Sequence, residues 1–218
     1  MILISTAYLP PVQYMSKFLQ GEVHIEKYEN YQKQSFRNRC CIYGANGIQC
    51  LVIPVKKNHG EKTPVTHVEV DFTMNWKGVH LKSIESAYRL SPFYEYYMDD
   101  IHELYAQQIP LLYDWNKHIL KAVLQMLDLR VDFKETAQWE VSTAYNDFRQ
   151  SISPKSRLAR PDSSFIPVPY QQVFIERYGF IPNLSIIDLL FNEGPQSLSI
   201  LKNSLYPPLA GAGGGSGI

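Results

Sequence analysis

The sequence predicts a single α/β or α+β domain, with a mixed sheet in the N-terminal part and helices in the middle and C-terminal parts. Short apolar or alternating runs, which are typical of strands, dominate the first third of the 218 residues. Apolar residues at helical spacing dominate the middle. The dipeptide Asn46-Gly47 predicts an antiparallel hairpin, so the sheet is expected to be mixed. We expect residues 1–208 to form this domain and the glycine-rich residues 209–218 to be a flexible tail.

The first third of the chain predicts strands, with one short helix between the first two. Pro11 suits a first helical turn, and Gly21 suits a C-terminal stop. Between them, Val12, Met15 and Leu19 recur at helical spacing. A strand on each side of this helix would make a β-α-β unit. The predicted strands lie at 1–5, 23–26, 36–43, 48–55 and 65–70.

Helical periodicity takes over in the middle of the chain. Trp76, Val79 and Ile84 fall on one helical face, while Pro92 and Pro110 mark boundaries between successive helices. The predicted elements here are helices at 76–87, 93–106 and 110–126 and a strand at 129–134.

The periodicity is lost from about residue 142 to residue 170. Residues 149–169 contain four prolines, and a long irregular stretch in a compact domain is more often functional than idle. We expect this segment to be irregular, more mobile than the helices, and a candidate lid. Order returns at Ser185, which forms a capping-box pattern with Asp188 at the start of a short apolar helix. Gly194-Pro195 ends that helix and opens the last one.

The composition excludes several classes of function. With 21 basic and 21 acidic side chains and a pI near 7.0, the whole protein lacks the charge that nucleic-acid binding needs. No apolar run approaches the length of a membrane span, and the first residues do not have the pattern of a signal peptide. We therefore expect a cytoplasmic protein without a transmembrane segment. The sequence does not indicate the oligomeric state.

The chain also lacks the common cofactor and metal signatures. Its three cysteines are odd in number and form no CxxC motif, so we expect free thiols and no metal site. The motifs GxGxxG, GxxxxGK[ST], HExxH and GxSxG are absent, and we expect no cofactor.

A basic stretch raises the question of an anion site. Residues 31–42 contain Lys33, Arg37 and Arg39 and no acid. In an extended strand these three side chains would share one face. A solvated or edge strand explains the pattern, because lysine and arginine discourage aggregation there. A site for phosphate or carboxylate explains it as well, and the sequence leaves both interpretations open.

Four other polar residues are candidates, each with a structural alternative. His80 is a candidate acid or base, although its position beside the apolar stripe is also that of a core histidine. Glu26 is a second candidate acid or base, and it can equally pair with a nearby cation. Asp188 and Asn183 fit a helix cap and a turn.

The motifs taken in order resemble the WbqC-like family of bacterial proteins, in the shorter form associated with Bacteroidetes-type bacteria. The resemblance covers most of residues 2–203. The motifs that carry it are Y8-L-P-P-V-Q-Y14, Y31-Q-K-Q-S-F-R-N-R39, L51-V-I-P-V55, W76-K-G-V-H80, Y88-R-L-S-P-F93 and G179-F-I-P-N-L-S-I-I-D-L-L-F-N192.

This resemblance implies a role in making surface polysaccharide of the O-antigen type. The implied activity is a transferase acting on a nucleotide-linked or amino sugar, so a phosphate-bearing or amino-sugar small molecule is the expected partner. The alternative is a non-catalytic binding or assembly subunit. The chain departs from the family pattern at Ser5-Thr6-Ala7 and at Glu26-Lys27, and roles tied to those positions do not carry over. The residues that do carry over as ligand-binding or catalytic candidates are Tyr8, Pro10, Lys33, Arg37, Asn38, Arg39, His80, Asn183 and Asp188.

Overall fold

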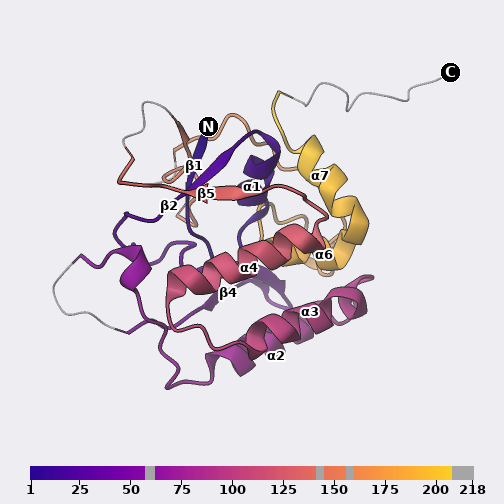
Figure 1. The fold of residues 1–218 in the computed structure, drawn as a ribbon. Coiled ribbons are helices and arrows are strands. Elements are labelled where there is room, and N and C mark those ends of the chain that lie inside the picture. The colour runs from indigo at the N-terminus through magenta and orange to yellow at the C-terminus, as the bar shows by residue number, and fades with distance from the viewer. Residues whose placement is uncertain (57–61, 141–144, 156–159, 208–218) are drawn as a thin grey trace.

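The computed structural model contains two small sheets covered by helices (Figure 1). It describes residues 1–56, 62–140, 145–155 and 160–207. One sheet is parallel and has the strand order β5-β2-β1-β6, and the other is an antiparallel pair of β3 and β4. The hairpin and the first two strands of the parallel sheet lie in the N-terminal part, and most helices follow, as the sequence predicts. The strands are β1 (Ile2–Ser5), β2 (Val23–Glu26), β3 (Arg39–Gly44), β4 (Gly47–Val52), β5 (Phe133–Glu135) and β6 (Asn146–Asp147).

The parallel sheet begins with the predicted β-α-β unit. β1 leads through α1 (Val12–Ser16) and the 3₁₀ turn η1 (Lys17–Leu19) into β2. β1 and β2 pair in parallel, with Ile2 opposite Val23. β5 then adds to the outer side of β2, and β6 adds to the free side of β1. β1 is thus a central strand, and its apolar run is buried, as parallel packing requires. All four strands are parallel, but β2 and β5 are added on one side of β1 and β6 on the other. The topological switch point of the sheet therefore lies between β1 and β6.

The hairpin of β3 and β4 follows the Asn46-Gly47 signal. Gly44 pairs with Gly47 across the turn, and Gly47 has a φ of +97°, a conformation that glycine adopts without strain. β3 begins only at residue 39, so the expected strand at 36–43 was too long at its start. Residues 33–38 form turns, because the chain must reverse there to bring Arg37 to an acidic partner.

Two other expected strands were wrong or displaced. Residues 65–70 form the 3₁₀ turn η2 (Val65–His67) followed by isolated bridges from Glu69 and Val70, so their alternating pattern reflects burial of single valines. The strand expected at 129–134 lies instead at 133–135, where it meets β2.

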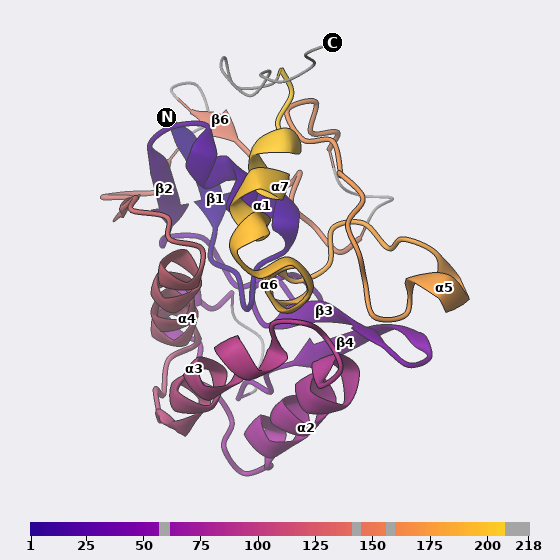
Figure 2. The same cartoon turned by 90° about the vertical axis from the view of Figure 1, so that its right-hand side faces the viewer.

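The three middle helices form as predicted. They are α2 (Trp76–Tyr88), α3 (Tyr94–Ala106) and α4 (Leu112–Met126), and they pack beside the hairpin and below the parallel sheet (Figure 2). α4 carries the most regular apolar face, with Trp115, Ile119 and Val123 fully buried. The C-terminal elements are α5 (Ile175–Tyr178), α6 (Ile186–Glu193), η4 (Gly194–Gln196) and α7 (Ser197–Asn203).

Gly194 fixes the end of α6 against the start of α3. It has a φ of +50°, and a Cβ atom at this position would lie 2.5 Å from the ring of Phe93. Only glycine satisfies both conditions. The predicted stop at Gly194-Pro195 is confirmed, and it also brings α7 close to α3 and α4.

The proline-rich segment is irregular in its described part, where no helix or strand runs between residues 149 and 169. It is nevertheless anchored. Lys17 forms a buried ion pair with Asp162 at 2.6 Å and donates to Ser164 at 2.8 Å. Burial lowers the pKa of Lys17, and the contact with Asp162 opposes that shift. Residues 156–159 lie outside the described residues, and the expected mobility stays a prediction.

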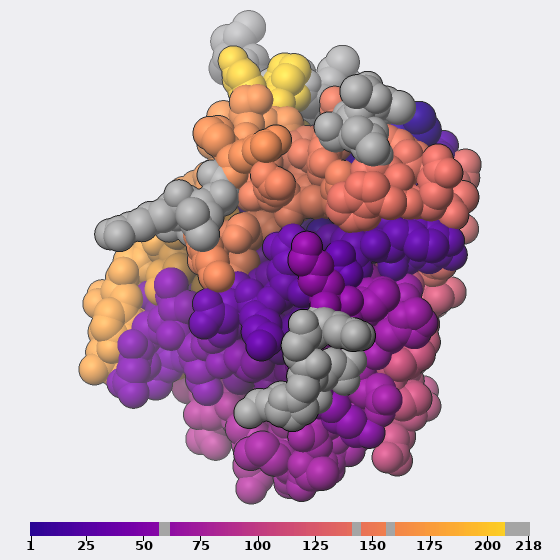
Figure 3. All heavy atoms as spheres, turned by 90° about the vertical axis from the view of Figure 1, so that its left-hand side faces the viewer, coloured from indigo at the N-terminus to yellow at the C-terminus, as the bar shows by residue number. Residues whose placement is uncertain are grey.

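On one face of the molecule the N-terminal residues form a band between two later parts of the chain (Figure 3). In the space-filling view this indigo segment lies between the salmon segment that follows α4 and the magenta helical region (Figure 3). No helix in the described ranges is long and apolar enough to cross a membrane.

Candidate functional site

Arg37 lies in a buried ion pair. Its Nε and Nη2 atoms donate to the two carboxylate oxygens of Glu29 at 2.7 and 2.5 Å, and Nη2 also donates to Ser5 Oγ at 2.7 Å. The Ser5 hydroxyl donates to Glu29 at 3.0 Å. Arg37 and Glu29 are only 4% and 3% exposed, so each charge depends on the other for stabilisation. These contacts favour a structural role for Arg37.

The other residues of the basic stretch are dispersed. Lys33 is exposed and makes no hydrogen bond or ion pair with the described residues. Asn38 is buried and donates to the first backbone carbonyl after β4 at 2.8 Å. Arg39 is half-buried on β3. Burial raises the pKa of the nearby Tyr31, and the positive charges of Arg37 and Arg39 partly oppose this shift. The three cations do not line one strand face, and anion binding by them stays a prediction.

Glu26 lies at the carboxyl end of β2 and is fully buried. It accepts hydrogen bonds from the Tyr28 N–H at 2.8 Å, the Thr136 hydroxyl at 2.9 Å and the Glu140 N–H at 3.0 Å. Arg149 Nη1 adds a fourth donor at 3.2 Å. These donors use the acceptor capacity of the carboxylate, which leaves little for a substrate. An acid or base role for Glu26 stays a prediction.

The switch point between β1 and β6 is nearly filled by side chains. Open parallel sheets commonly bind ligands at the carboxyl ends of their strands at such a point. Here Thr6, Tyr14, Arg37 and Arg149 help to line a cavity of only about 10 Å³. That volume is close to what one water molecule needs. A molecule much larger than water does not fit this cavity.

Tyr8 and His80 meet in the core. The Tyr8 hydroxyl lies 2.8 Å from His80 Nδ1 and also contacts the Tyr105 hydroxyl. Burial lowers the pKa of His80 to about 4, although a hydrogen bond with the backbone of Val52 acts in the opposite direction. His80 is therefore neutral at pH 7, and it is only 3% exposed. This placement agrees with the core-histidine interpretation, and a catalytic role for His80 stays a prediction.

Asn183 and Pro10 connect the segment that runs from the loop after β1 into α1 with the segment that leads into α6. The Gln13 N–H donates to Asn183 Oδ1 at 2.9 Å, and Asn183 Nδ2 donates to Gln13 Oε1 at 3.1 Å. The Ile186 N–H donates to the Pro10 carbonyl at 2.8 Å. Both residues therefore join the two ends of the chain.

Asp188 is the acceptor of a buried network and does not form a capping box. Its Oδ1 accepts from the Tyr88 hydroxyl at 2.9 Å, and its Oδ2 accepts from the Tyr170 hydroxyl at 2.6 Å and Gln172 Nε2 at 2.9 Å. Burial raises the pKa of Asp188 to about 6, although all three donors act to lower it. The expected capping box was wrong in detail, because Ser185 Oγ donates to a carbonyl in the loop after β1.

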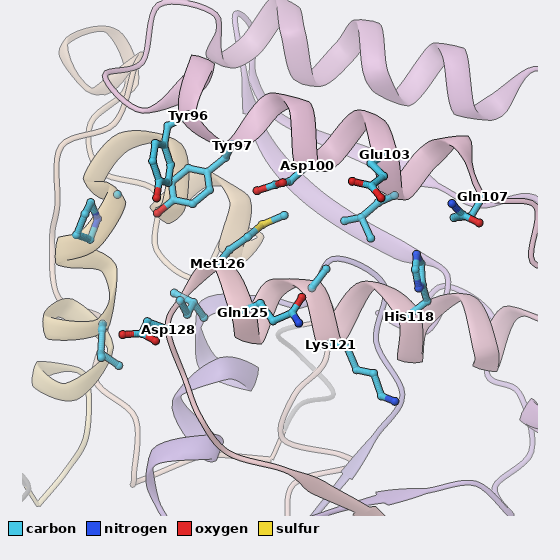
Figure 4. Close-up of a pocket in the computed structure, with 16 residues that line it drawn as sticks. Tyr96, Tyr97, Asp100, Glu103, Gln107, His118, Lys121, Gln125, Met126 and Asp128 are labelled. Atoms are coloured by element: carbon cyan, nitrogen blue, oxygen red, sulfur yellow. The ribbon is translucent and has the colours of Figure 1, made fainter.

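A groove large enough for a ligand lies between α3 and α4 (Figure 4). Its volume is about 790 Å³, within the range of small-molecule sites. The start of α7 closes one end. Tyr96 and Tyr97 lie near that end with their rings edge to face, 4.7 Å apart at 84°. Tyr97 forms part of the wall and is 3% exposed, whereas Tyr96 is 72% exposed at the mouth.

The groove has an excess of negative charge. Asp100 and Glu103 lie on its α3 side, and Asp128 lies near its closed end. Neither Asp100 nor Glu103 forms an ion pair or hydrogen bond within the described ranges. Lys121 is the single lysine or arginine of the lining, and its side chain points away from α3 in Figure 4.

The remaining polar groups suit a ligand with several hydroxyl groups. Gln107 and Gln125 each present an amide, which both donates and accepts hydrogen bonds. His118 rises from α4 toward the α3 side (Figure 4). Its Nε2 atom is buried without a hydrogen-bond partner in the described part of the chain.

Comparison with known proteins places the chain in a family. The sequence profile of the WbqC-like protein family matches residues 6–158 and 162–200. The chain belongs to the WbqC-like family. Searches of curated proteins and of solved structures found no match.

The WbqC-like match covers the parallel-sheet end and the groove between α3 and α4. It includes the charged network at the carboxyl ends of the parallel strands and every residue that lines the groove. It confirms the resemblance that the sequence motifs indicated. The family name points to a polysaccharide-related function at a coarse level.

None of the residues predicted from the motifs of this WbqC-like chain lines the groove. The polar residues of the groove lie outside the apolar stripes of α3 and α4. Charged side chains are normal at such helix positions, so they do not indicate a binding site in the sequence. The sequence shows that residues 93–106 are rich in tyrosine, but it does not show that Tyr96 is exposed. The sequence alone does not show that α3 and α4 face each other.

Proposed function

We propose that this protein recognises an amino sugar in the groove between α3 and α4, as part of cytoplasmic synthesis of bacterial surface polysaccharide. The groove itself is the observation that carries the proposal. Among the described residues it combines the volume, the aromatic surface and the unpaired polar groups that a sugar requires. Membership of the WbqC-like family supports the polysaccharide context.

The charge of the groove favours one of the two substrate classes that the family resemblance implies. Asp100 and Glu103 attract a protonated amine and repel the phosphates of a nucleotide-linked sugar. The single lysine of the lining, Lys121, points away from α3 and does not offset them (Figure 4). The amino sugar is therefore the better fit for this site.

The aromatic residues supply the apolar surface. The C–H face of a sugar ring packs against an aromatic ring, and Tyr96 offers its ring at the mouth of the groove. The amides of Gln107 and Gln125 can pair with ring hydroxyls in either direction. Amine, apolar face and hydroxyls then each have a partner of suitable chemistry.

Binding of glucosamine, N-acetylglucosamine and UDP-N-acetylglucosamine, measured by calorimetry or saturation-transfer NMR, tests this proposal. We expect the free amine to bind most tightly and the nucleotide-linked sugar most weakly. Glu103→Gln should weaken glucosamine binding by about 1 kcal/mol, or about fivefold, because it removes one charge near the amine. Glu85→Gln on α2 is the matched control, since Glu85 is also exposed on a helix and lies outside the groove. Equal binding of the amine and its acetylated form would contradict the proposal.

A transferase needs a base in addition to this binding site. A protonated amine must lose its proton before its nitrogen can attack a donor carbon and displace a leaving group. Imidazole is the usual general base in proteins, and His118 lines the groove. Its Nε2 atom is unpartnered but buried, so the His118 ring has to turn toward the amine before Nε2 can accept that proton. Under this hypothesis His118→Gln keeps glucosamine binding and abolishes turnover. The alternative is that the protein is a non-catalytic binding subunit. In that case the wild-type protein binds the sugar but does not turn over any donor.

A further inference from the structure

Two cysteines face each other across the hairpin of β3 and β4. Cys41 on β3 is directly opposite Cys50 on β4, and their sulfur atoms are 2.7 Å apart. Both are free thiols in this structure. The third cysteine, Cys40, is 1% exposed and points to the opposite face of the strand.

Cys41 and Cys50 occupy a non-hydrogen-bonded position of the antiparallel β3–β4 pair. Opposite residues in an antiparallel pair alternate between hydrogen-bonded and non-hydrogen-bonded positions. The Cys41 carbonyl accepts from the Ser185 N–H at 2.8 Å, and the Tyr43 N–H donates to the Tyr88 hydroxyl at 3.0 Å. These two residues of β3 therefore turn their backbone groups away from β4.

Such a position suits a disulfide bond. Opposite Cα atoms at non-hydrogen-bonded positions lie about 4.5 Å apart, within the range that disulfides span. A sulfur–sulfur bond is about 2.05 Å long, so the two sulfur atoms need to move by less than about 1 Å. β3 and β4 can keep their register when the bond forms.

The two thiols differ in access. Cys50 is exposed on β4, whose other side has no neighbouring strand in the described sheet. Cys41 is half-buried, and its burial together with the adjacent Cys50 thiol raises its pKa to about 12. An oxidant in solution therefore reaches Cys50 first, and Cys41 acts second.

We propose that Cys41 and Cys50 are a reversible oxidation site, which a small-molecule disulfide such as oxidised glutathione converts into an intrachain disulfide. The Cys50 thiolate attacks one sulfur of oxidised glutathione, which forms a mixed disulfide and releases one glutathione thiol. Cys41 loses its proton and attacks Cys50 Sγ, and the second glutathione leaves as a thiolate that takes up a proton. One protein disulfide replaces one small-molecule disulfide, so atoms and electrons balance.

Free thiols counted by mass spectrometry after alkylation test the proposal. We expect wild-type protein with oxidised glutathione to keep one alkylated cysteine, Cys40, and to yield a linked peptide containing Cys41 and Cys50. The melting temperature should rise by about 5–10 °C, because the bond closes a short loop of the unfolded chain. A reducing agent should reverse both changes.

Three variants separate the roles of the cysteines. Cys40→Ser should leave the disulfide intact. Cys41→Ser should stop the reaction at a stable mixed disulfide on Cys50, whereas Cys50→Ser should greatly slow any reaction. Three alkylated cysteines in oxidised wild-type protein would overturn the proposal. So would a lasting mixed disulfide or an interchain dimer of the wild type.

Discussion

Arg37→Ala is expected to lower the free energy of unfolding by about 3–5 kcal/mol, the usual cost of removing one partner of a buried ion pair. The change leaves the Glu29 carboxylate buried with only the Ser5 hydroxyl as a side-chain donor. It also opens space beside the cavity at the end of β1. Urea unfolding followed by circular dichroism measures the difference.

Lys33→Ala is the matched control for this prediction. It removes a cation from the same basic stretch, but Lys33 is exposed and has no partner among the described residues. Its effect should stay within about 0.5 kcal/mol. An Arg37→Ala variant with wild-type stability and weaker phosphate binding would restore the anion-site interpretation of this stretch. The double variant Arg37→Ala/Glu29→Ala should cost less than the two single changes added together.

Asp188→Ala is expected to destabilise the protein by a similar amount, about 3–5 kcal/mol. Three buried donors lose their acceptor at once, and each unsatisfied group costs about 1–3 kcal/mol before the site relaxes. Tyr170 and Gln172 would lose their connection to α6. Hydrogen exchange should therefore speed up around residues 170–172 more than in α4. Equal protection in both regions would contradict a local role for Asp188.

The same network predicts a dependence on pH. The pKa of Asp188 is raised from 3.8 to about 6 in the folded state, so between these values the folded protein holds a proton that the unfolded chain releases. Stability is therefore highest below about pH 4 for this group and falls as the pH rises to about 6. The total loss is about 3 kcal/mol, from about 1.4 kcal/mol for each pH unit. Asp188→Asn cannot titrate, so its unfolding free energy should lack this component across the same interval. Parallel curves for wild type and Asp188→Asn between pH 4 and pH 7 would refute the assignment.

The sequence predicted the elements whose signals are local. The Asn46-Gly47 turn, the β-α-β start and the three middle helices each depend on spacing within a few residues, and all are present. The prediction for residues 65–70 was wrong because single buried valines in a 3₁₀ turn imitate strand alternation. Periodicity reports which side chains are buried, and it does not say what covers them.

The site depended on contacts that the sequence does not encode locally. Arg37 and Glu29 are eight positions apart, and they meet only because the chain reverses between them. Glu29 then neutralises the charge of Arg37, although the sequence around Arg37 is basic. The donors of Asp188 come from α2 and from the segment before α5, far from the capping pattern that suggested its role. The groove requires α3 and α4 to face each other, and its lining mixes buried apolar residues such as Leu104 and Leu127 with polar residues at their edge.

The pairing of β1 on both sides also sets the order in which the protein can fold during synthesis. β1 is made before the other strands and meets β2 soon afterwards, but its other edge stays open until Asn146 and Asp147 have been made. The ion pair of Lys17 with Asp162 and the hydrogen bond from the Val12 N–H to the Leu184 carbonyl can form only later still, once those partners have been made. Long-range contacts of this kind slow folding, since the chain must close large loops before it gains their stabilisation. The nascent chain thus carries an apolar strand with one open edge, and Lys17 without its acidic partner, until residues 146–162 have been made. We expect chaperone binding to the N-terminal third in this interval.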